Sequence, residues 1–359
     1  RLGKFRDPPV AEVAYARHPD GTPKALRYRN KVQWSLEHGA TGWTMGYFAE
    51  HSHRMVPFST CWLLDDAFHA VRDWLAANLP PVARLHRAQV RQNAEGQLLV
   101  SLSGPDATPD RLGSMAEAML AAMPGVYGVT GRAKPHGPDV CLAGSALLME
   151  TLAGGRYLLS PDSFFQVNRD VSELLIAAMR ERMPQPCERL VDIYAGVGTF
   201  AIALHGQFRK AWLVESHPDA LGNARDNLRI NGCDRFQLLA GDIRRQLRGL
   251  PERVDVAVVD PPRAGCHESV MAWLAEHVTD TIFYVSCDPA RRTPRPIVGD
   301  WRSYCPSTCS RRPTTWRPWP SCEPREAEAK STQGAHSQII EGCASLAKAG
   351  VARSIALYL

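Results

Sequence analysis

The feature that most constrains the fold is a strand, a glycine turn and a helix start that follow one another between residues 190 and 200. This stretch reads Leu-Val-Asp-Ile-Tyr-Ala-Gly-Val-Gly-Thr-Phe. Its β-branched apolar residues predict a buried strand, and the apolar pattern that resumes at Phe200 predicts a helix. The glycines let the backbone approach a ligand closely, and a helix N-terminus favours electron-rich groups. One such turn is weak evidence for any particular ligand.

Strands and helices alternate strictly from this turn onwards. The expected strands span 190–194, 211–215, 236–239, 254–259 and 282–285. Expected helices lie at 171–183, 200–205, 219–230, 243–247 and 268–277. Near-continuous apolar strands separated by helices predict a parallel, doubly wound α/β sheet. Ligands of such sheets bind at the carboxyl ends of the strands, near the point where the strand order reverses.

The chain before residue 160 has a different pattern, which predicts a separate α+β domain. Short strands are expected at 32–36, 44–48, 54–58, 84–91, 98–103 and 126–132, with more between 140 and 159, and helices at 65–79 and 110–123. Basic and aromatic residues are interleaved at Arg27, Tyr28, Arg29, Lys31, Trp34 and Arg54. This interleaving fits a solvated sheet face and an RNA-facing surface equally well.

The composition changes abruptly at Arg291. Residues 291–325 contain eight Arg, seven Pro and three Trp against two acidic residues, without helical or strand periodicity. This segment is not expected to continue the sheet, and only 339–359 regains weak helical and strand character. We therefore expect an α+β domain at 1–160, an α/β domain at 161–290 and an atypical tail at 291–359.

The overall composition excludes few classes of protein. An apolar content of 45% among 359 residues is ordinary for a globular chain, and the formal net charge of +5 is compatible with a polyanionic partner without indicating one. The ten cysteines are scattered, and no apolar run is long enough to span a membrane. We therefore expect a cytoplasmic protein with free thiols.

Acidic residues end the second and third strands of the predicted sheet. Glu215 has no Lys or Arg beside it, so its carboxylate can accept both hydroxyls of a ribose. Asp242 is placed where a carboxylate could hold an adenine amino group. The first turn lacks the third glycine of the NAD fingerprint, which favours S-adenosylmethionine over NAD.

Five motifs that follow one another along the chain point to a specific protein family. They are Tyr28-Arg-Asn-Lys-Val, the segment 46–61, Phe164-Phe-Gln-Val-Asn, Asp260-Pro-Pro-Arg and Ser286-Cys-Asp-Pro. Together they resemble the RNA 5-methyluridine methyltransferases, bacterial enzymes of ribosomal RNA and a related transfer-RNA enzyme, over residues 28–289. The resemblance implies a class I adenosylmethionine-dependent methyltransferase fold and an RNA substrate.

The chemistry of that family explains why a cysteine follows the fifth strand. Uracil C5 is too poor a nucleophile to attack a methyl sulfonium, whereas a thiolate added to C6 makes C5 an enolate carbon. The resemblance implies that Cys287 is this nucleophile, although many cysteines are simply buried apolar residues. Arg263 or the local backbone could supply the positive potential that the thiolate needs.

The resemblance also implies the cofactor contacts. They fall on Gln166, Tyr194, Glu215 and Asp242, with Thr199 a lesser candidate and Asp260 between the cofactor and the target base. Asp260 could instead be a helix cap, and Phe165 is either core or a stacking residue. Cys266 and His267 are adjacent but do not make a metal site by themselves. No metal is expected.

Three departures from the family matter. The chain has no room for the N-terminal oligonucleotide-binding domain of many members, and Cys61 matches one ligand of a four-iron cluster with no cysteine before it, which fits a truncated start. The family's closing Phe-Pro-x-Thr-x-His-Val-Glu motif, whose glutamate removes the C5 proton, is absent. The sequence around the tail glutamates does not match this motif at Glu323, Glu326, Glu328 or Glu341. We therefore expect a frame-shifted or otherwise aberrant tail.

Three readings of function stay open. The first is uridine C5 methylation, with ribosomal RNA favoured by Cys61 and a target base flipped out to reach Cys287. The second is methylation of a base amino group. Enzymes of that kind have an aromatic residue after the two prolines, and the Arg263 found at this position argues against it. The third is an RNA-binding remnant without turnover, which the missing glutamate permits. Cys305, Cys309 and Cys322 in the tail are a minor metal-ligand alternative.

Overall fold

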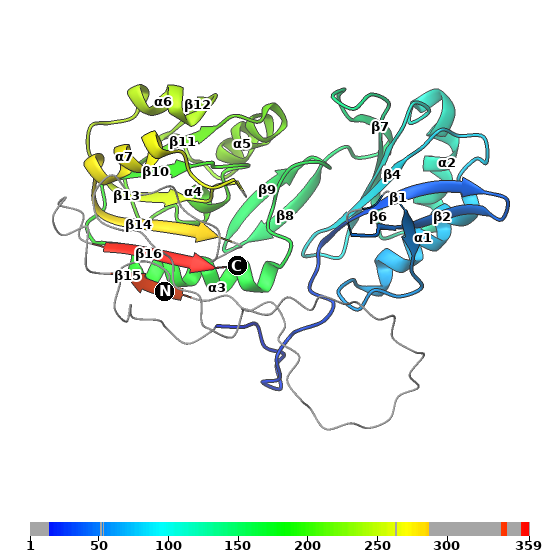
Figure 1. The fold of residues 1–359 in the computed structure, drawn as a ribbon, viewed down its shortest axis with the longest axis horizontal. Coiled ribbons are helices and arrows are strands. Elements are labelled where there is room, and N and C mark those ends of the chain that lie inside the picture. Colours follow the sequence, from blue (N-terminus) through cyan, green and yellow to red (C-terminus); the bar gives the residue numbers. More distant parts are fainter. Residues whose placement is uncertain are drawn as a thin grey trace.

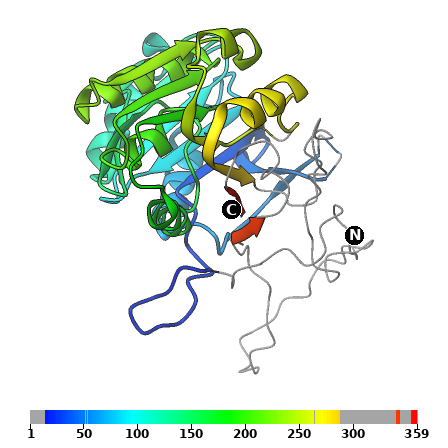
Figure 2. The ribbon, with the colours of Figure 1, turned by 90° about the vertical axis from the view of Figure 1, so that its left-hand side faces the viewer.

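The described part of the chain contains two seven-stranded sheets, each with its own core, and one two-stranded sheet (Figure 1). The computed structural model describes residues 14–50, 52, 54–262, 264–286, 339–342 and 353–358. Figure 2 looks along the second sheet from the amino ends of its strands, with the first sheet behind it. No helix in this described part is long and apolar enough to cross a membrane.

The first sheet has the strand order β3-β2-β1-β4-β5-β6-β7. Its strands are β1 Lys31–Gly39, β2 Gly42–Phe48, β3 Met55–Pro57, β4 Arg87–Gln92, β5 Leu98–Ser103, β6 Val126–Arg132 and β7 Val140–Gly144. Helices α1 (Asp66–Asn78) and α2 (Pro109–Ala122) pack on one face, where alternate residues such as Val32 and Trp34 of β1 are buried. The carboxylate of Asp65 caps α1 by accepting from the Ala67 N–H at 3.0 Å.

The second sheet has the order β12-β11-β10-β13-β14-β16-β15. Its strands are β10 Arg189–Ile193, β11 Lys210–Glu215, β12 Phe236–Ala240, β13 Val254–Val259, β14 Val278–Ser286, β15 Ile339–Gly342 and β16 Arg353–Tyr358. All neighbouring pairs are parallel except β15 with β16. The two last strands come from the expected tail, so the sheet is longer than the five predicted strands.

Helices cover both faces of the second sheet, which confirms the doubly wound α/β prediction. One face packs against α3 (Arg169–Arg182), α4 (Thr199–Ala203) and α5 (Pro218–Ile230). The other packs against α6 (Ile243–Gln246), the short 3-10 helix η1 (Leu247–Gly249) and α7 (Glu268–His277). Residues of β10 therefore point alternately into two apolar cores, as a strand buried on both faces requires.

A hairpin of β8 (Leu148–Leu152) and β9 (Gly155–Leu159) corrects one expectation. The sequence assigned all strands between 140 and 159 to the first domain, but only β7 pairs with that sheet. Leu152, Tyr157 and Leu159 of the hairpin lie in the core formed by α3, α4 and the second sheet. The alternating pattern specified a hairpin but not which core it would cover.

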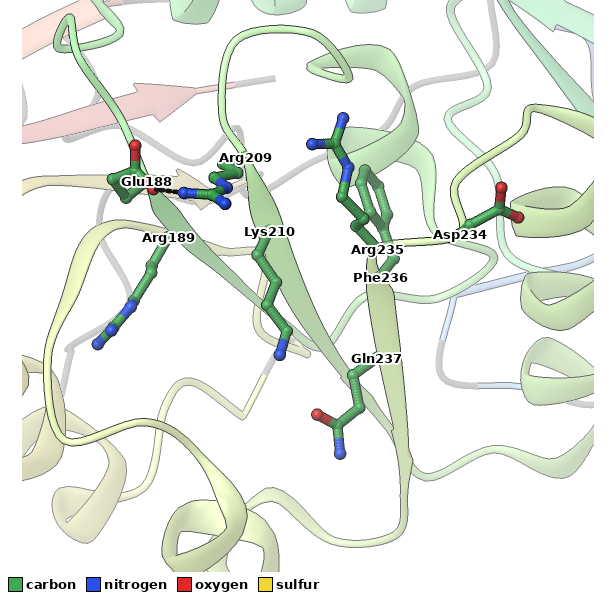
Figure 3. A pocket seen from close by; sticks show the side chains of 8 residues that line it. All are labelled: Glu188, Arg189, Arg209, Lys210, Asp234, Arg235, Phe236 and Gln237. Atoms are coloured by element: carbon green, nitrogen blue, oxygen red, sulfur yellow. Dashed lines mark hydrogen bonds and ion pairs between the residues drawn. The ribbon is translucent and has the colours of Figure 1, made fainter.

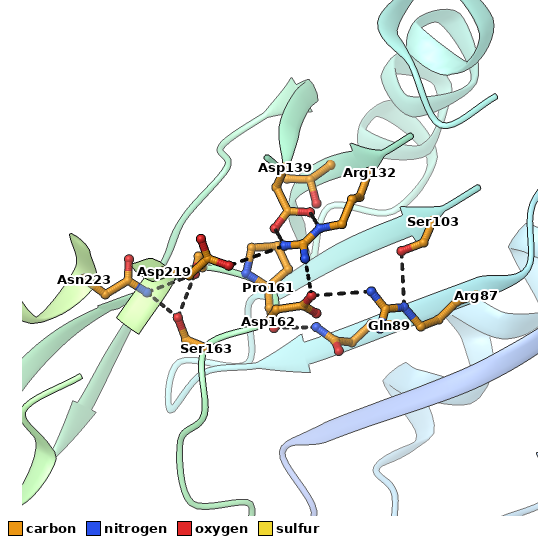
Figure 4. Close-up of polar contacts among 12 residues, drawn as sticks. Arg87, Gln89, Ser103, Arg132, Asp139, Pro161, Asp162, Ser163, Asp219 and Asn223 are labelled. Carbon is orange, nitrogen blue, oxygen red and sulfur yellow. Dashed lines mark hydrogen bonds and ion pairs between the residues drawn. The ribbon is translucent and has the colours of Figure 1, made fainter. Parts of the chain in front are cut away.

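The polar face of the first sheet meets the segment 160–163 that leads into the second (Figure 4). Arg132 of β6 pairs with Asp162 at 2.6 Å and with Asp139 at 2.6 Å. Asp162 also accepts from Arg87 at 3.4 Å, and Gln89 donates to the carbonyl of Pro161. Charged side chains thus hold the junction of the two parts, where apolar packing holds each core.

Candidate active site

The strand order of the second sheet reverses between β10 and β13, and the predicted site residues gather at the carboxyl ends of these strands. The turn after β10 is held by Asp192, whose Oδ2 accepts from the Ala201 N–H at 3.1 Å. Asp192 is completely buried, and burial raises its pKa to about 7. Gly196 has a φ of +57°, and a Cβ there would meet nothing within 4 Å, so this turn leaves open space above the sheet.

Glu215 ends β11 with its carboxylate fixed in place. Its Oε2 accepts from the Gly196 N–H at 2.8 Å, and its Oε1 accepts from the N–H groups of Ser216 and His217 at 2.6 and 2.7 Å. These bonds join the ends of β10 and β11. A carboxylate has about four acceptor positions, so an acceptor position remains for a further donor such as a hydroxyl.

Tyr194 follows β10 with a φ of +64°, a left-handed conformation that is uncommon for a bulky residue. Its hydroxyl lies 3.8 Å from the sulfur of Cys266. Burial raises the pKa of the Tyr194 phenol and raises that of the Cys266 thiol to about 11. Both groups are therefore neutral near pH 7. Strain of this kind, of order 1 kcal/mol or more, is found most often at ligand sites.

We expected the Asp242 carboxylate to be available to an adenine amino group, but it is already hydrogen-bonded within the protein. It caps α6 by accepting from the Arg244 N–H at 2.9 Å, and its two oxygens also accept from the Arg244 guanidinium. This pairing holds the pKa of Asp242 well below its usual range. Arg244 is a site residue that sequence reasoning did not single out, because the expected basic helix gave no sign of pairing back onto its own cap.

A cavity of about 360 Å³ lies over these strand ends. It is lined by Tyr194, Val214, Glu215, Ser216, Gly241, Asp242, Ile243, Arg244, Pro262, Ala264, Gly265 and His267. Three of the predicted cofactor contacts thus share one cavity of the size that small-molecule ligands use. Thr199 does not line it: Thr199 is buried at the start of α4, and its carbonyl accepts from the Tyr157 hydroxyl at 3.1 Å.

Gln166 and Asp260 do not line this cavity but meet close to its lining: Asp260 is two residues before Pro262, and its N–H donates to the Ile193 carbonyl at 3.4 Å, directly before Tyr194. The Gln166 side-chain amide donates to Asp260 Oδ2 at 3.2 Å, although the two residues are 94 positions apart. Burial raises the pKa of Asp260 to about 7. Asp260 is therefore a half-buried carboxyl with a side-chain partner from the domain junction, and its position beyond β13 leaves α7 to be capped by His267 instead.

The two adjacent phenylalanines of the motif take opposite positions. Phe165 is buried and packs against Tyr157, with ring centroids 5.3 Å apart, so it belongs to the core. Phe164 is 65% exposed and precedes Gln166 by two residues. Sequence reasoning considered Phe165 for stacking and missed Phe164, because a loop has no period that tells which of two neighbours points outwards.

The interleaved basic and aromatic residues of the first domain do not form a single surface. Trp34 lies in the core, whereas Arg27, Arg29 and Arg54 are exposed. Lys31 is partly buried at the domain junction, where burial lowers its pKa to about 7. The three arginines remain available to a partner, although Arg27 pairs with Asp66 at 2.7 Å.

Several predicted residues lie outside the described part of the chain. These are Cys287, Arg263, and the tail residues Cys305, Cys309, Cys322, Glu323, Glu326 and Glu328. Ser286, directly before Cys287, is the last residue of β14, the strand next to β13. Glu341 lies in β15 opposite Ile355 of β16. Among the described residues, no three His, Cys, Asp or Glu side chains come together as metal ligands would.

A larger cavity, of about 580 Å³, lies at the amino ends of β10, β11 and β12 (Figure 3). Its lining contains none of the predicted site residues and includes Arg189, Arg209, Lys210 and Arg235. Arg189, Lys210 and Gln237 project to the same side of the sheet. This cavity is separated from the glycine turn by the length of the strands.

Comparisons with known proteins identify the family. No protein-family model matches the chain. A curated protein of Gloeobacter violaceus, named an uncharacterized RNA methyltransferase, is 32% identical over 310 residues, which cover 80% of this chain and 66% of that protein. A Synechocystis protein of the same name is 30% identical over 311 residues, with the same coverage. The chain belongs to the family of these proteins. It spans 66% of the length of both relatives.

A solved structure shares the fold. The tRNA (uracil-54, C5)-methyltransferase of Pyrococcus abyssi, solved with S-adenosyl-L-homocysteine, matches with a TM-score of 0.57 and 21% identity over 74% of this chain and 66% of that one. The class I methyltransferase fold that the sequence motifs implied is therefore confirmed. At this identity the likeness concerns the fold alone.

Proposed function

We propose that this protein methylates C5 of a uridine in RNA, with S-adenosylmethionine as methyl donor and Cys287 as the nucleophile that adds to C6. The observation that supports this most directly is the Gln166–Asp260 hydrogen bond beside the cavity that holds Glu215 and Tyr194. It brings together two polar side chains that could recognise a base. They lie close to a cavity that could hold a nucleoside, at the carboxyl ends of the strands.

The cavity fits an adenosyl group. The fixed carboxylate of Glu215 would accept ribose hydroxyls, the open turn at Gly196 would admit the ligand close to the backbone, and the ring of Tyr194 would form one wall. Asp242 would reach an adenine amino group only by sharing its oxygens with Arg244. When bound, the cofactor would supply an electrophilic methyl group.

The target uridine would lie on the other side of Asp260. Gln166 and Asp260 offer a donor and an acceptor for the carbonyl and N3–H groups of uracil, and the exposed ring of Phe164 offers a stacking face. Because the pKa of Asp260 is near 7, its carboxyl can act as donor or acceptor at neutral pH. A base in a duplex would have to be flipped out to reach this position.

Cys287 directly follows β14 in the chain, which is why it is our candidate nucleophile. Its thiolate would form a bond to C6 and move the ring π electrons onto C5 and the O4 carbonyl, so that C5 becomes nucleophilic. After C5 has accepted the methyl group, a base removes the C5 proton, the C5–C6 double bond re-forms and the thiolate leaves. The side chain that takes this proton is not assigned.

Covalent trapping tests the nucleophile separately from the proton acceptor. In 5-fluorouridine RNA the C5 proton is replaced by fluorine, so a working nucleophile and cofactor site should accumulate a protein–RNA adduct even without a base. We expect an adduct that Cys287→Ala abolishes and Cys141→Ala, at an exposed thiol of β7, leaves intact. Absence of an adduct from this chain and from a version with a restored C-terminal glutamate motif would contradict the proposal.

Turnover on unmodified uridine then distinguishes an active enzyme from an impaired one. An adduct with fluorinated RNA, but no 5-methyluridine from ordinary RNA, would identify a catalytically impaired member that binds RNA. Methyl groups found on a base amino nitrogen would instead support the alternative enzymatic reading.

We further propose a bacterial-type ribosomal RNA as the substrate, and the cytoplasm as the place of action. The support is the sequence match of Cys61 to a ligand position of ribosomal-RNA members; the described residues hold no cluster of metal ligands around it. Assays with large-subunit ribosomal RNA and with transfer-RNA transcripts, compared at equal concentration, would decide between the two. Faster methylation of transfer RNA would overturn this choice.

A further inference from the structure

An exposed tryptophan of the first domain has no role in the candidate site. Trp62 is 68% exposed, whereas most tryptophans bury most of their large ring. It lies in the turn between β3 and α1. A large aromatic face left in water is a common sign of an interaction surface.

Three segments of chain connect Trp62 to the site. The Arg27 N–H donates to the Trp62 carbonyl at 2.9 Å, and the Arg29 N–H donates to the Leu63 carbonyl at 3.0 Å. On the other side of the same segment, the Asn30 N–H donates to the Val167 carbonyl at 2.9 Å. Arg29 pairs in parallel with Leu64 and in antiparallel with Asn168, so Trp62 and Gln166 lie on opposite sides of this segment and about four residues apart along it. Two spacings of about 4.8 Å across and four residues of about 3.3 Å along place the two backbones roughly 16 Å apart.

A second aromatic side chain and a cation accompany Trp62. Tyr47 of β2 is 40% exposed, and its ring stacks on Phe58 with centroids 5.0 Å apart. Phe58 and Cys61, the residue before Trp62, pack against the same apolar core. Burial raises the pKa of the Tyr47 phenol. Arg29 is exposed, and no carboxylate in the described part of the chain lies within ion-pair distance of it.

We propose that Trp62, Tyr47 and Arg29 form a platform for an unpaired nucleotide of the substrate RNA, close to the target uridine. A base would stack on the indole, and the guanidinium would contact a backbone phosphate. Aromatic faces beside a cation are how proteins hold single-stranded nucleic acid with little dependence on sequence. The separation of roughly 16 Å corresponds to about five stacked nucleotides at about 3.4 Å each. The platform rests on the proposed function insofar as RNA is the substrate.

The test measures RNA affinity of the full chain, at one fixed salt concentration, for two RNAs. One is a hairpin with a uridine-rich single-stranded loop, and the other is a fully paired duplex of the same length. For Trp62→Ala we expect roughly 10-fold weaker binding of the loop RNA and no change for the duplex, because only unpaired bases can stack. Trp62→Phe should retain most of the affinity.

The control is Tyr127→Ala, which removes an exposed aromatic ring of β6 in the same sheet. It should leave both affinities unchanged. Equal loss on loop and duplex with Trp62→Ala, or no loss on either, would overturn the platform, as would a wild-type chain that binds no RNA. Methylation at a position other than uridine C5 would contradict the proposed reaction and leave a Trp62-dependent loop affinity as evidence for the platform.

Discussion

A cavity lies at each end of strands β10 to β12, and the two cavities differ in volume, in the charge of their lining residues and in backbone conformation. At the amino ends the cavity is larger, about 580 Å³ against about 360 Å³, and four of its eight lining residues are Arg or Lys. At the carboxyl ends the lining contains Glu215, Asp242 and two glycines with positive φ. Volume alone would favour the amino ends, whereas the proposed cofactor contacts lie at the carboxyl ends.

The backbone explains the difference. At the amino ends the strands begin in regular register, and none of the lining residues has a positive φ. At the carboxyl ends the chain has to leave the sheet toward opposite faces, which places Tyr194, Gly196 and Gly198 in left-handed conformations. Such backbone is stable only where its surroundings hold it, so strain and desolvated carboxyls mark a ligand site better than size does.

The largest expected effect comes from Glu215→Gln. This change removes the charge that should bind ribose hydroxyls, and charge-assisted hydrogen bonds contribute about 1.5–3 kcal/mol each. We expect S-adenosylmethionine affinity, measured by calorimetry, to fall about 100-fold. Glu188→Gln is the matched control at the amino ends, where Glu188 is paired with Arg209 at 3.4 Å. Equal losses in both variants would mean that the two ends do not differ in function.

Asp192→Asn tests how burial of the Asp192 carboxyl makes the free energy of unfolding depend on pH. The native pKa of Asp192 is raised to about 7, so between pH 4 and pH 7 the folded state holds a proton that the unfolded chain has lost. The free energy of unfolding therefore falls as pH rises through this range and stays low above it. Asparagine does not ionise, and it can still accept from Ala201.

We expect the stability advantage of Asp192→Asn over the wild type to grow by about 2 kcal/mol from pH 5 to pH 8 in denaturant titrations. The control is Gln237→Ala at the amino ends, which changes no titratable group and should show no such growth. A constant difference across pH would mean that Asp192 is ionised throughout and that burial does not desolvate it.

The candidate residues at the carboxyl end could be named from the sequence because their signals are local. Glycines two apart after an apolar strand permit few backbone paths, and Glu215 could be recognised because it ends an uninterrupted apolar run. The family resemblance alone made Gln166 and Asp260 candidates, and these two residues, 94 positions apart, are hydrogen-bonded in the structure.

What the sequence could not predict depends on contacts between distant or equivalent residues. The β8–β9 hairpin alternates correctly for either core, so its packing against α3 and α5 was not predictable from pattern. Arg244 pairs with the cap of its own helix, a choice that depends on side-chain rotamers. The same limit applies to Thr199, which the family resemblance made a lesser candidate for a cofactor contact but which is buried and does not line the cavity.

A smaller effect is expected from Asp255→Ala at the amino ends. Asp255 Oδ2 accepts from the N–H groups of Glu188 and Arg189, both at 2.8 Å, and so fixes the start of β10. Loss of these bonds at a solvent-exposed strand start should lower the free energy of unfolding by about 1 kcal/mol. Cofactor affinity should stay within 2-fold of the wild type. A large fall in affinity would show that the two ends are coupled through β10.

The smallest effect should come from Tyr194→Phe. The Tyr194 hydroxyl has a thiol at 3.8 Å as its partner, a weak contact, whereas the ring lines the cavity and the backbone sits at a φ of +64°. If Tyr194 acts through its ring, phenylalanine should change cofactor affinity by less than about 2-fold and stability by less than about 0.5 kcal/mol. Calorimetry of the variant beside Glu215→Gln makes the contrast direct, because one change removes a charge from the carboxyl end and the other leaves its shape intact. A 10-fold loss would instead assign the hydroxyl a direct bond to the cofactor, and would place a second polar contact at this end of the sheet.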